Sequence, residues 1–274
     1  MEKSTMPRTL TLPENTQGRD FVIGDLHGAH ELLKRAMKEA KFDPTKDRVI
    51  SVGDLVDRGP NSPDALWLLK QPWFFAVRGN HEALFLNICE KDGKLNHLAQ
   101  EFNKSANGLD WVFKEKPETL AALREAFSKL PYAIEVKTDR GMVGFIHAEV
   151  PAGMDWATFK KKLEDGDIST MRSALLSRKR GEAGDNTGVP GIDRIFMGHT
   201  VQSGGVKQRG NCFYIDTGGV FRLMETATEP GLFLTFTDIR AETKDLTGPA
   251  EKERPEKVVT KAPPKGQPFM PKAA

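Results

Sequence analysis

Five short apolar runs in this sequence lead directly into residues that can bind metal ions or move protons. The segments are "FVIGDLHG", "RVISVGDLVDRG", "FFAVRGNHE", "VGFIHAE" and "IFMGHT". They contain four of the six histidines of the chain, and the complete set is Asp25, His27, Asp54, Asn80, His81, His147 and His199. A single histidine or aspartate after a strand is an ordinary loop residue, but five such clusters at equivalent positions indicate one common site.

The residue types in these clusters define the chemistry. Carboxylate, imidazole and amide groups without thiolates form a ligand set that suits Mn²⁺, Fe or Zn²⁺. Six residues are enough for two ions if one carboxylate bridges them: Asp25, His27, Asp54, Asn80, His147 and His199. Two ions about 3.5–4 Å apart lower the pKa of a bridging water and neutralise phosphoryl oxygens, which is an arrangement used for phosphoester hydrolysis.

The elements that must position these residues are short strands alternating with helices. Strands are predicted at residues 21–23, 48–52, 73–77, 142–146, 194–197, 212–215 and 232–236, and helices at 30–40 and 117–130. This alternation predicts an α/β fold, and open α/β sheets bind ligands beyond the carboxyl ends of their strands. Residues 148–190 lack strong strand patterns, and we expect a flexible loop near the site.

The composition narrows the class of protein. Hydrophobic residues make up 38% and charged residues 28% of the 274 residues, which is sufficient for a packed core. A net charge of +2 and the lack of a basic stripe give no sign of a nucleic-acid partner. Cys89 and Cys212 have no metal-binding spacing, which is typical of reduced thiols in the cytosol. We expect a cytoplasmic protein, since neither a signal peptide nor an apolar run of about 20 residues is visible; the oligomeric state is not readable.

The motifs "GDLHG", "GDLVDRG" and "GNHE", in this order, closely resemble the signature of the phosphoprotein phosphatase (PPP) family of serine/threonine phosphatases. The later segments "HAEVP", "GHT" and "YIDTGGVF" resemble its C-terminal blocks, so the resemblance spans about residues 20–225. It is strongest to the bacteriophage-lambda-type serine/threonine protein phosphatase and its bacterial relatives.

This resemblance implies a calcineurin-like metallophosphoesterase fold, a β-sandwich of two mixed sheets flanked by helices. It also implies hydrolysis of phosphoserine and phosphothreonine monoesters in proteins or peptides by a hydroxide that bridges two divalent ions. Mn²⁺ is the expected metal, with Fe or Zn²⁺ as alternatives. The implied domains are an N-terminal extension (1–19), a catalytic domain (20–240) and a disordered tail rich in proline and lysine (241–274).

The resemblance also implies roles for single residues. The first metal would be held by Asp25, His27 and Asp54, and the second by Asp54, Asn80, His147 and His199. His81 would not be a ligand in this family; it would act as the general acid, with its imidazolium stabilised by Asp57. Glu82 would hold a ligand or water in place.

Two arginines are expected to bind the substrate phosphate. Arg58 is the first, because a guanidinium matches two phosphoryl oxygens. Arg178 aligns best with the second, but Leu176 stands where the family usually has tryptophan, so Arg180 is an alternative. Asp216 is expected to be structural. His30 and His97 match no motif and are expected on helix surfaces.

Three other functions are compatible with parts of the pattern. Symmetrical diadenosine-tetraphosphate hydrolases share the fold, but their signature resembles "GDxQG" and "GNHD", whereas this chain has "GDLHG" and "GNHE". A broad-specificity phosphoesterase of the same fold would carry the same metal ligands. A non-catalytic binding module would be expected to have lost ligands, and none of the predicted positions is lost.

Overall fold

The computed structural model describes residues 7–103, 107–223, 232–242 and 245 of the 274-residue chain. The strands of this part are β1 (Thr9–Leu12), β2 (Asp20–Ile23), β3 (Arg48–Ser51), β4 (Phe74–Ala76), β5 (Ala133–Thr138), β6 (Gly141–Ile146), β7 (Arg194–Met197), β8 (Lys207–Arg209), β9 (Cys212–Tyr214) and β10 (Phe236–Asp238). Its α-helices are α1 (His30–Glu39), α2 (Ala65–Leu68), α3 (Asn80–Ile88), α4 (Leu98–Asn103), α5 (Pro117–Ser128), α6 (Trp156–Glu164), α7 (Ile168–Leu176) and α8 (Lys179–Ala183).

The strands form two mixed sheets. One sheet has the order β10-β2-β3-β4, in which β2, β3 and β4 are parallel and β10 is antiparallel to β2. The other has the order β1-β5-β6-β7-β9-β8, in which β6, β7 and β9 are parallel. The strands that lead into the predicted site residues are therefore parallel neighbours within each sheet, and their carboxyl ends share one edge.

The two sheets face each other across a core of branched and aromatic side chains. Val22 and Ile50 from the first sheet pack with Phe145, Phe196 and Phe213 from the second, and all five are at most 2% exposed. Burial of apolar surface on this scale is the main favourable term in folding.

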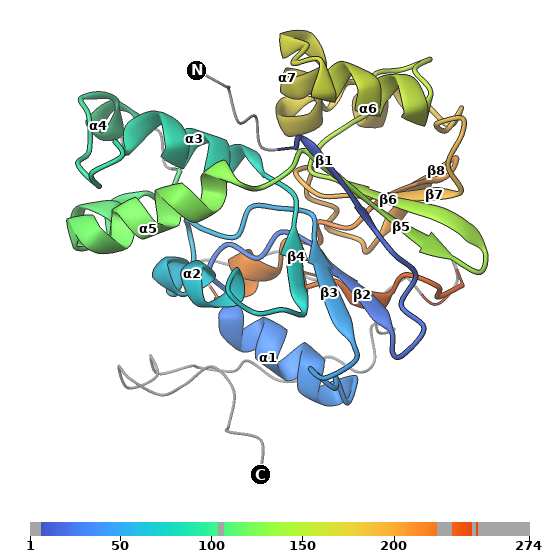
Figure 1. Ribbon diagram of the computed structural model, residues 1–274, viewed down its shortest axis with the longest axis horizontal. Coiled ribbons are helices and arrows are strands. Elements are labelled where there is room, and N and C mark those ends of the chain that lie inside the picture. The colour runs from blue at the N-terminus through green and yellow to red at the C-terminus, as the bar shows by residue number, and fades with distance from the viewer. Residues whose placement is uncertain (1–6, 104–106, 224–231, 243–244, 246–274) are drawn as a thin grey trace.

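Helices cover the outer face of each sheet (Figure 1). The first sheet packs against α1, α2, α3 and α5, with buried contacts such as Leu33, Leu68, Phe85 and Phe127. The second packs against α6 and α7 through Trp156 and other residues. The predicted β-sandwich of two mixed sheets flanked by helices is confirmed.

Residues 148–190 differ from the flexible loop expected there. They contain α6, α7 and part of the core, because Trp156, Phe159 and Leu163 recur on one helix face and are at most 2% exposed. Asp155 caps α6 by accepting a hydrogen bond from the amide of Thr158. This amphipathic spacing is a helical signal, and the loop prediction was wrong.

Several other elements depart from expectation. The predicted strand at 232–236 is replaced by β10, which begins only at Phe236, because Phe233 forms a bridge to Gly218 instead. The strands β1, β5 and β8 were not predicted. His30 is not on the surface: it lies in α1 on the face toward the core and is 2% exposed.

The structure describes much of the predicted N-terminal extension but little of the predicted C-terminal tail. Within the predicted extension 1–19, β1 pairs in parallel with β5 and Leu12 is buried, so this part is built into the second sheet. The predicted tail 241–274 lies outside the described residues except for three positions, and its disorder stays a prediction. Among the helices in the described ranges, none is long and apolar enough to span a membrane.

Candidate active site

The loops that follow β2 and β3 are joined to each other by backbone hydrogen bonds. The amides of Leu26 and His27 donate to the carbonyl of Asp54, at 3.1 and 2.7 Å. In the second sheet, the amide of Gly198 donates to the carbonyl of His147 at 2.8 Å, which joins the loops after β6 and β7. The parallel strands thus carry their chemistry-bearing residues into fixed loops at one edge of the sandwich.

The backbone of these loops adopts conformations that ordinary residues avoid. Among the described non-glycine residues, six have positive φ, and five of them are predicted site residues: His27, Asp54, Asp57, Arg58 and His199. A non-glycine residue at positive φ is uncommon, and such strain concentrates at functional sites. The concentration here marks this edge independently of any sequence motif.

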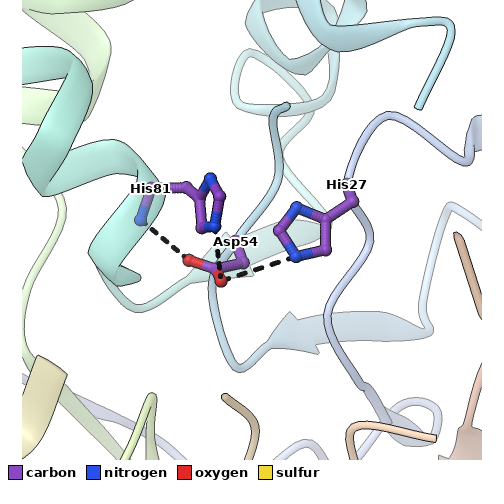
Figure 2. A group of neighbouring side chains, drawn as sticks. All are labelled: His27, Asp54 and His81. Atoms are coloured by element: carbon purple, nitrogen blue, oxygen red, sulfur yellow. Dashed lines mark hydrogen bonds and ion pairs between the residues drawn. The ribbon is translucent and has the colours of Figure 1, made fainter. Parts of the chain in front are cut away.

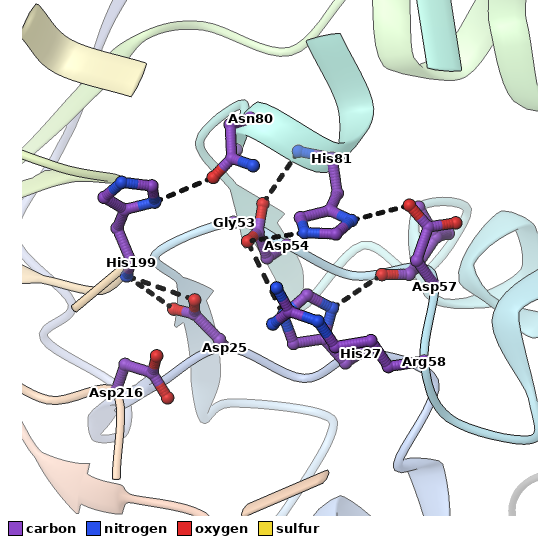
Figure 3. A network of polar contacts seen from close by, with 12 residues as sticks. Asp25, His27, Gly53, Asp54, Asp57, Arg58, Asn80, His81, His199 and Asp216 are labelled. Carbon is purple, nitrogen blue, oxygen red and sulfur yellow. Dashed lines mark hydrogen bonds and ion pairs between the residues drawn. The ribbon is translucent and has the colours of Figure 1, made fainter. Parts of the chain in front are cut away.

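The two glycines around the "DLVDR" turn are required for different reasons. Gly53 has φ +97°, a conformation that L side chains rarely adopt. Gly59 lies so close to the loop after β2 that a Cβ atom would be 2.0 Å from the carbonyl oxygen of His27. The segment therefore turns sharply, and the turn brings Asp54, Asp57 and Arg58 toward one region (Figure 3).

Asp54 lies at the centre of the site. Its Oδ2 atom is 3.6 Å from Nε2 of His27 and 3.8 Å from Nε2 of His81. Figure 2 shows these three side chains turned toward one another. Its Oδ1 atom is 3.4 Å from Nε2 of His147 and accepts a hydrogen bond from the amide of His81. One carboxylate oxygen therefore faces the rings of His27 and His81, and the other faces the ring of His147, as a bridging ligand requires.

Two groups of side chains have ligand atoms close enough to hold a metal ion, within 4.8 Å of one another. One group is His27, Asp54 and His81, and the other is Asp54, His147 and His199. Asp54 belongs to both. This sharing agrees with the prediction that it bridges two ions, although the first group contains His81 in place of Asp25.

Asn80 completes the second group. Its Oδ1 atom lies 2.8 Å from Nε2 of His147. The same atom lies 2.8 Å from Nδ1 of His199, a contact that Figure 3 shows. Burial lowers the pKa of both histidines, that of His199 to about 3, so both rings are neutral near pH 7. Neutral imidazole is the form that binds metal ions.

The geometry around His147 fits a metal ion. Its Nδ1 lies 2.8 Å from the carbonyl oxygen of Val52 and must carry the ring proton, since a carbonyl can only accept. The unprotonated Nε2 then faces oxygen atoms of Asn80 and Asp54 at 2.8 and 3.4 Å. A lone pair against two oxygens is repulsive unless a cation lies among them.

His27 is oriented in the same way in the first group. Its Nδ1 lies 2.7 Å from the carbonyl oxygen of Val56, which leaves the Nε2 lone pair directed into the site. There it accepts a hydrogen bond from Nη1 of Arg58 at 2.5 Å. In this structure the cation beside His27 is therefore a guanidinium.

Asp25 lies next to the first group rather than inside it. Its carboxylate accepts a hydrogen bond from the backbone amide of His199, and Figure 3 shows Asp216 beside it. Burial, together with the charges of Asp216 and Asp54, raises the pKa of Asp25 well above its usual value. Burial, together with the charge of Asp54, raises the pKa of Asp216 to about 6. Three neighbouring carboxylates, each at most 3% exposed, need positive charge to remain ionised.

His81 is held by a carboxylate on the side away from Asp54. Its Nδ1 is 2.6 Å from Oδ2 of Asp57, and Trp111 donates its indole N–H to the other oxygen of Asp57 at 2.6 Å. Burial opposes the charged imidazolium, but Asp54 and Asp57 outweigh it, so the pKa of His81 lies above its ordinary value. A histidine that keeps its proton and points Nε2 into the site can act as an acid.

The three arginines considered from the sequence occupy different environments. Arg58 is half-buried, contacts His27, and lies over the ring of Phe221. Arg178 is exposed at the rim and donates to the carbonyl of His199 at 3.2 Å. Arg180 is 4% exposed and pairs with Asp185 at 2.7 Å, which directs it away from the site. The geometry therefore favours Arg178 over Arg180 as a phosphate ligand.

Glu82 fastens the loops of the first half. Its fully buried carboxylate accepts hydrogen bonds from the backbone amides of Asp54, Leu55 and Gly79. Burial and the charge of Asp54 raise the pKa of Glu82 to about 7. It contacts the backbone of Asp54 rather than a ligand atom, which is consistent with the predicted positioning role.

Two residues near the site were not assigned a role from the sequence. Trp111 donates a hydrogen bond to Asp57 and stacks on Phe85. Asp216 was expected to be structural, and its carboxylate adds to the buried charge beside Asp25. Neither has a local sequence signal, because a side chain's partner across 54 residues is set only by tertiary packing.

The chain is similar in sequence to several known proteins. A family model described as "Calcineurin-like phosphoesterase" matches residues 21–203. The serine/threonine-protein phosphatase 1 of Salmonella typhimurium is 35% identical over 208 residues, covering 73% of this chain and 87% of the relative. A symmetrical bis(5'-nucleosyl)-tetraphosphatase of Dechloromonas aromatica is 41% identical over 101 residues, covering 34% of this chain and 36% of that relative.

The fold is also found among solved structures. The crystal structure of a protein provisionally assigned as a diadenosine tetraphosphatase matches with a TM-score of 0.55 and 21% identity. The match covers 78% of this chain and 89% of that one. At this identity the likeness concerns the fold alone.

Proposed function

The chain belongs to the calcineurin-like phosphoesterase family, and from this premise we propose that it is a serine/threonine protein phosphatase. The family makes it a metallophosphoesterase, and therefore a hydrolase. The observation that carries the finer proposal is the completeness of the site together with 35% identity over 87% of a serine/threonine-protein phosphatase. Its substrates would be phosphoserine and phosphothreonine in proteins or peptides, in a cytoplasmic setting.

The metal ligands in this proposal are the nitrogen and oxygen donors that lie around Asp54. His27 and Asp54, with Asp25 beside them, would hold one ion; Asp54, Asn80, His147 and His199 would hold the other. Two divalent ions, when bound, activate water for attack on phosphorus and neutralise the phosphoryl oxygens. Mn²⁺ is our proposed metal, with Fe or Zn²⁺ as alternatives, because the donors are nitrogen and oxygen.

The residues of the chain would then orient the phosphate and supply a proton. Arg58 and Arg178 would bind phosphoryl oxygens, which both guanidinium groups can do in a bidentate manner. His81 would donate the proton of its Nε2 to the leaving alcohol oxygen. Asp57 would keep the ring oriented and charged through its contact with Nδ1, at 2.6 Å.

A second function is supported by a specific observation. The symmetrical bis(5'-nucleosyl)-tetraphosphatase relative is 41% identical over its matched segment. Against it, the chain has His27 and Glu82 where the signature of those hydrolases has glutamine and aspartate. His27 directs a ring nitrogen at Asp54, and Glu82 accepts hydrogen bonds from three backbone amides. Both residues that differ from that signature therefore make contacts within the site. A broad-specificity phosphoesterase is the remaining alternative.

Activity on defined substrates tests this proposal. The purified full-length chain, treated with EDTA and reloaded with Mn²⁺, Fe²⁺ or Zn²⁺ in turn, would be given phosphoserine, phosphothreonine and phosphotyrosine peptides, diadenosine tetraphosphate and p-nitrophenyl phosphate. We expect the highest kcat/KM on a phosphoserine or phosphothreonine peptide with Mn²⁺. A higher kcat/KM on diadenosine tetraphosphate would contradict the proposal, and equal rates on all esters would favour broad specificity.

A further inference from the structure

A buried carboxylate outside the metal site holds the segment that carries Arg178. Glu149 follows His147 by two residues and is 1% exposed. Its side chain accepts hydrogen bonds from four donors: Ser177 Oγ at 2.8 Å, the amide of Arg180 at 3.0 Å, the amide of Gly181 at 2.8 Å and Tyr214 Oη at 3.1 Å. Three of these donors belong to Ser177, Arg180 and Gly181, which lie on both sides of Arg178 in the chain.

The backbone of Glu149 is tied to the same region. Its amide donates to the carbonyl of Ser173, and the hydroxyl of Ser173 donates back to its carbonyl at 3.2 Å. The preceding amide, that of Ala148, donates to the carbonyl of Ala174. The short segment 147–149 therefore joins a predicted metal ligand to the end of α7, from which the chain continues to Arg178.

The chemistry of the four contacts suits a side chain whose two oxygens both accept hydrogen bonds. Every partner is a neutral donor, and a carboxylate offers two oxygens that only accept. Glutamine has the same shape, but its NH₂ group would face donors and leave them unpaired, at a cost of about 1–3 kcal/mol for each buried group. The amides of Arg180 and Gly181 lie in the first turn of α8, where backbone N–H groups have no carbonyl partner within the helix. Glu149 supplies the acceptor for both.

The position of Arg178 depends on this arrangement. Arg178 precedes α8 as its capping residue with φ −124° and ψ 6°, and no side-chain cap bond holds it. Its own described contact to the site is the hydrogen bond to the carbonyl of His199 at 3.2 Å. Glu149 thus holds the turn between α7 and α8 through its three hydrogen bonds to residues 177–181. The side chain of Arg180 adds an ion pair with Asp185, which follows α8.

We propose that Glu149 is a positioning residue for phosphate binding, which holds the α7–α8 turn so that Arg178 reaches the substrate phosphate. The inference rests on the proposed function, because it requires Arg178 to bind phosphate. It assigns Glu149 no contact with substrate or metal.

The test compares Glu149→Gln with Arg178→Ala, and with Tyr214→Phe as the matched control. Tyr214 donates to the same carboxylate from β9, outside the turn, so its variant loses a bond to Glu149 without freeing Arg178. We expect Glu149→Gln to raise both KM and the inhibition constant of inorganic phosphate about 10-fold, with kcat changed less. Loss of a residue that holds a binding group in place typically costs about 10- to 100-fold, and the lower value is used here. Tyr214→Phe should leave both constants within about twofold, as for changes away from a binding group.

The double variant shows whether the two residues act together. If Glu149 acts through Arg178, adding Glu149→Gln to Arg178→Ala should raise KM little further, because the effects are not additive for coupled residues. Hydrogen exchange of the Ser177–Gly184 amides, measured on the full chain, should quicken in Glu149→Gln and not in Tyr214→Phe. If Glu149→Gln does not fold, Ser177→Ala removes one donor within the turn and should raise KM about threefold.

The outcomes separate this inference from the proposed function. If Arg178→Ala weakens phosphate binding but Glu149→Gln does not, the positioning role is overturned and the proposed function stands. If Arg178→Ala itself leaves phosphate binding unchanged, the clamp role fails, and the inference fails with it. An increase in KM for Tyr214→Phe equal to that of Glu149→Gln would show a general loss of structure and would also overturn the inference.

Discussion

The two halves of the site are built in different ways. The half at the ends of β2, β3 and β4 comes from one continuous stretch, residues 20–82, whose loops bond to each other through backbone groups and through Glu82. The half at the ends of β6 and β7 is interrupted by three helices, and its turn is held by Glu149. Contacts within one stretch of chain join the loops of the first half, with distant contacts such as that of Trp111 added to them, whereas contacts between distant segments hold the second half.

Asp54 joins the two halves, and Asp54→Asn should have the largest effect. Enzymes commonly accelerate reactions at least about 10⁶-fold, and we expect loss of most of that, more than about 10⁴-fold, since both groups lose the shared carboxylate. Activity and bound metal, measured by inductively coupled plasma mass spectrometry, should fall together. Asp92→Asn, at an exposed turn, is the control and should change neither. If one full equivalent of metal remained, the halves would bind independently of Asp54.

His81→Asn tests the division of roles within the first half. The variant removes a general acid, and we expect kcat to fall about 10²–10⁴-fold. Metal content should stay at the wild-type level, although His81 is grouped with His27 and Asp54 by distance. His97→Asn, at an exposed position, should behave like wild type. Loss of metal in His81→Asn would make His81 a ligand rather than an acid.

Trp111→Phe probes a contact that reaches the first half from a distant segment. It removes the 2.6 Å hydrogen bond to Asp57, and a bond to a charged group contributes about 1.5–3 kcal/mol. We expect kcat to fall about 10-fold with KM unchanged. Trp156→Phe removes an equivalent bond to Glu135, far from His81, and should lower thermal stability without lowering kcat. Equal kcat losses in both variants would argue against a role through Asp57.

The two buried thiols should show the smallest effect, with one beside each sheet. Cys89 directly follows α3 and Cys212 lies in β9, and burial raises the pKa of each to about 11. The thiolate is the reactive form, so at pH 8, below this pKa, the protonated thiols should react with Ellman's reagent far more slowly than in unfolded protein. Rates for Cys89→Ser and Cys212→Ser report the two sheets separately, and rapid reaction of one native thiol would show that the structure around it opens.

The contrast between the halves explains what could be predicted from the sequence. The strand ends of the first half follow short apolar runs in direct succession, so residue types and spacing alone place Asp54, Asn80 and His81 together. Their convergence with His147 and His199 was also predictable, because both follow apolar runs. These are properties of local pattern and of the edge shared by parallel strands.

The remaining parts depend on contacts that no local pattern encodes. Trp111 reaches Asp57 across 54 residues, and Glu149 reaches Arg180 across 31. β8, of sequence KQR, is a polar strand at the sheet edge and has no apolar alternation to reveal it. The helices within 148–190 were missed although Trp156, Phe159 and Leu163 have helical spacing.

The left-handed residues of the site have a consequence for the evolution and engineering of this chain. Each non-glycine residue with positive φ costs on the order of 1–3 kcal/mol of folding free energy. Five of the site residues have positive φ. Glycine would relieve that cost at Arg58, partly offset by its greater freedom in the unfolded chain. A selection for heat resistance alone would therefore favour variants that give up catalysis, and a search for thermostable forms should exclude these five positions from the start.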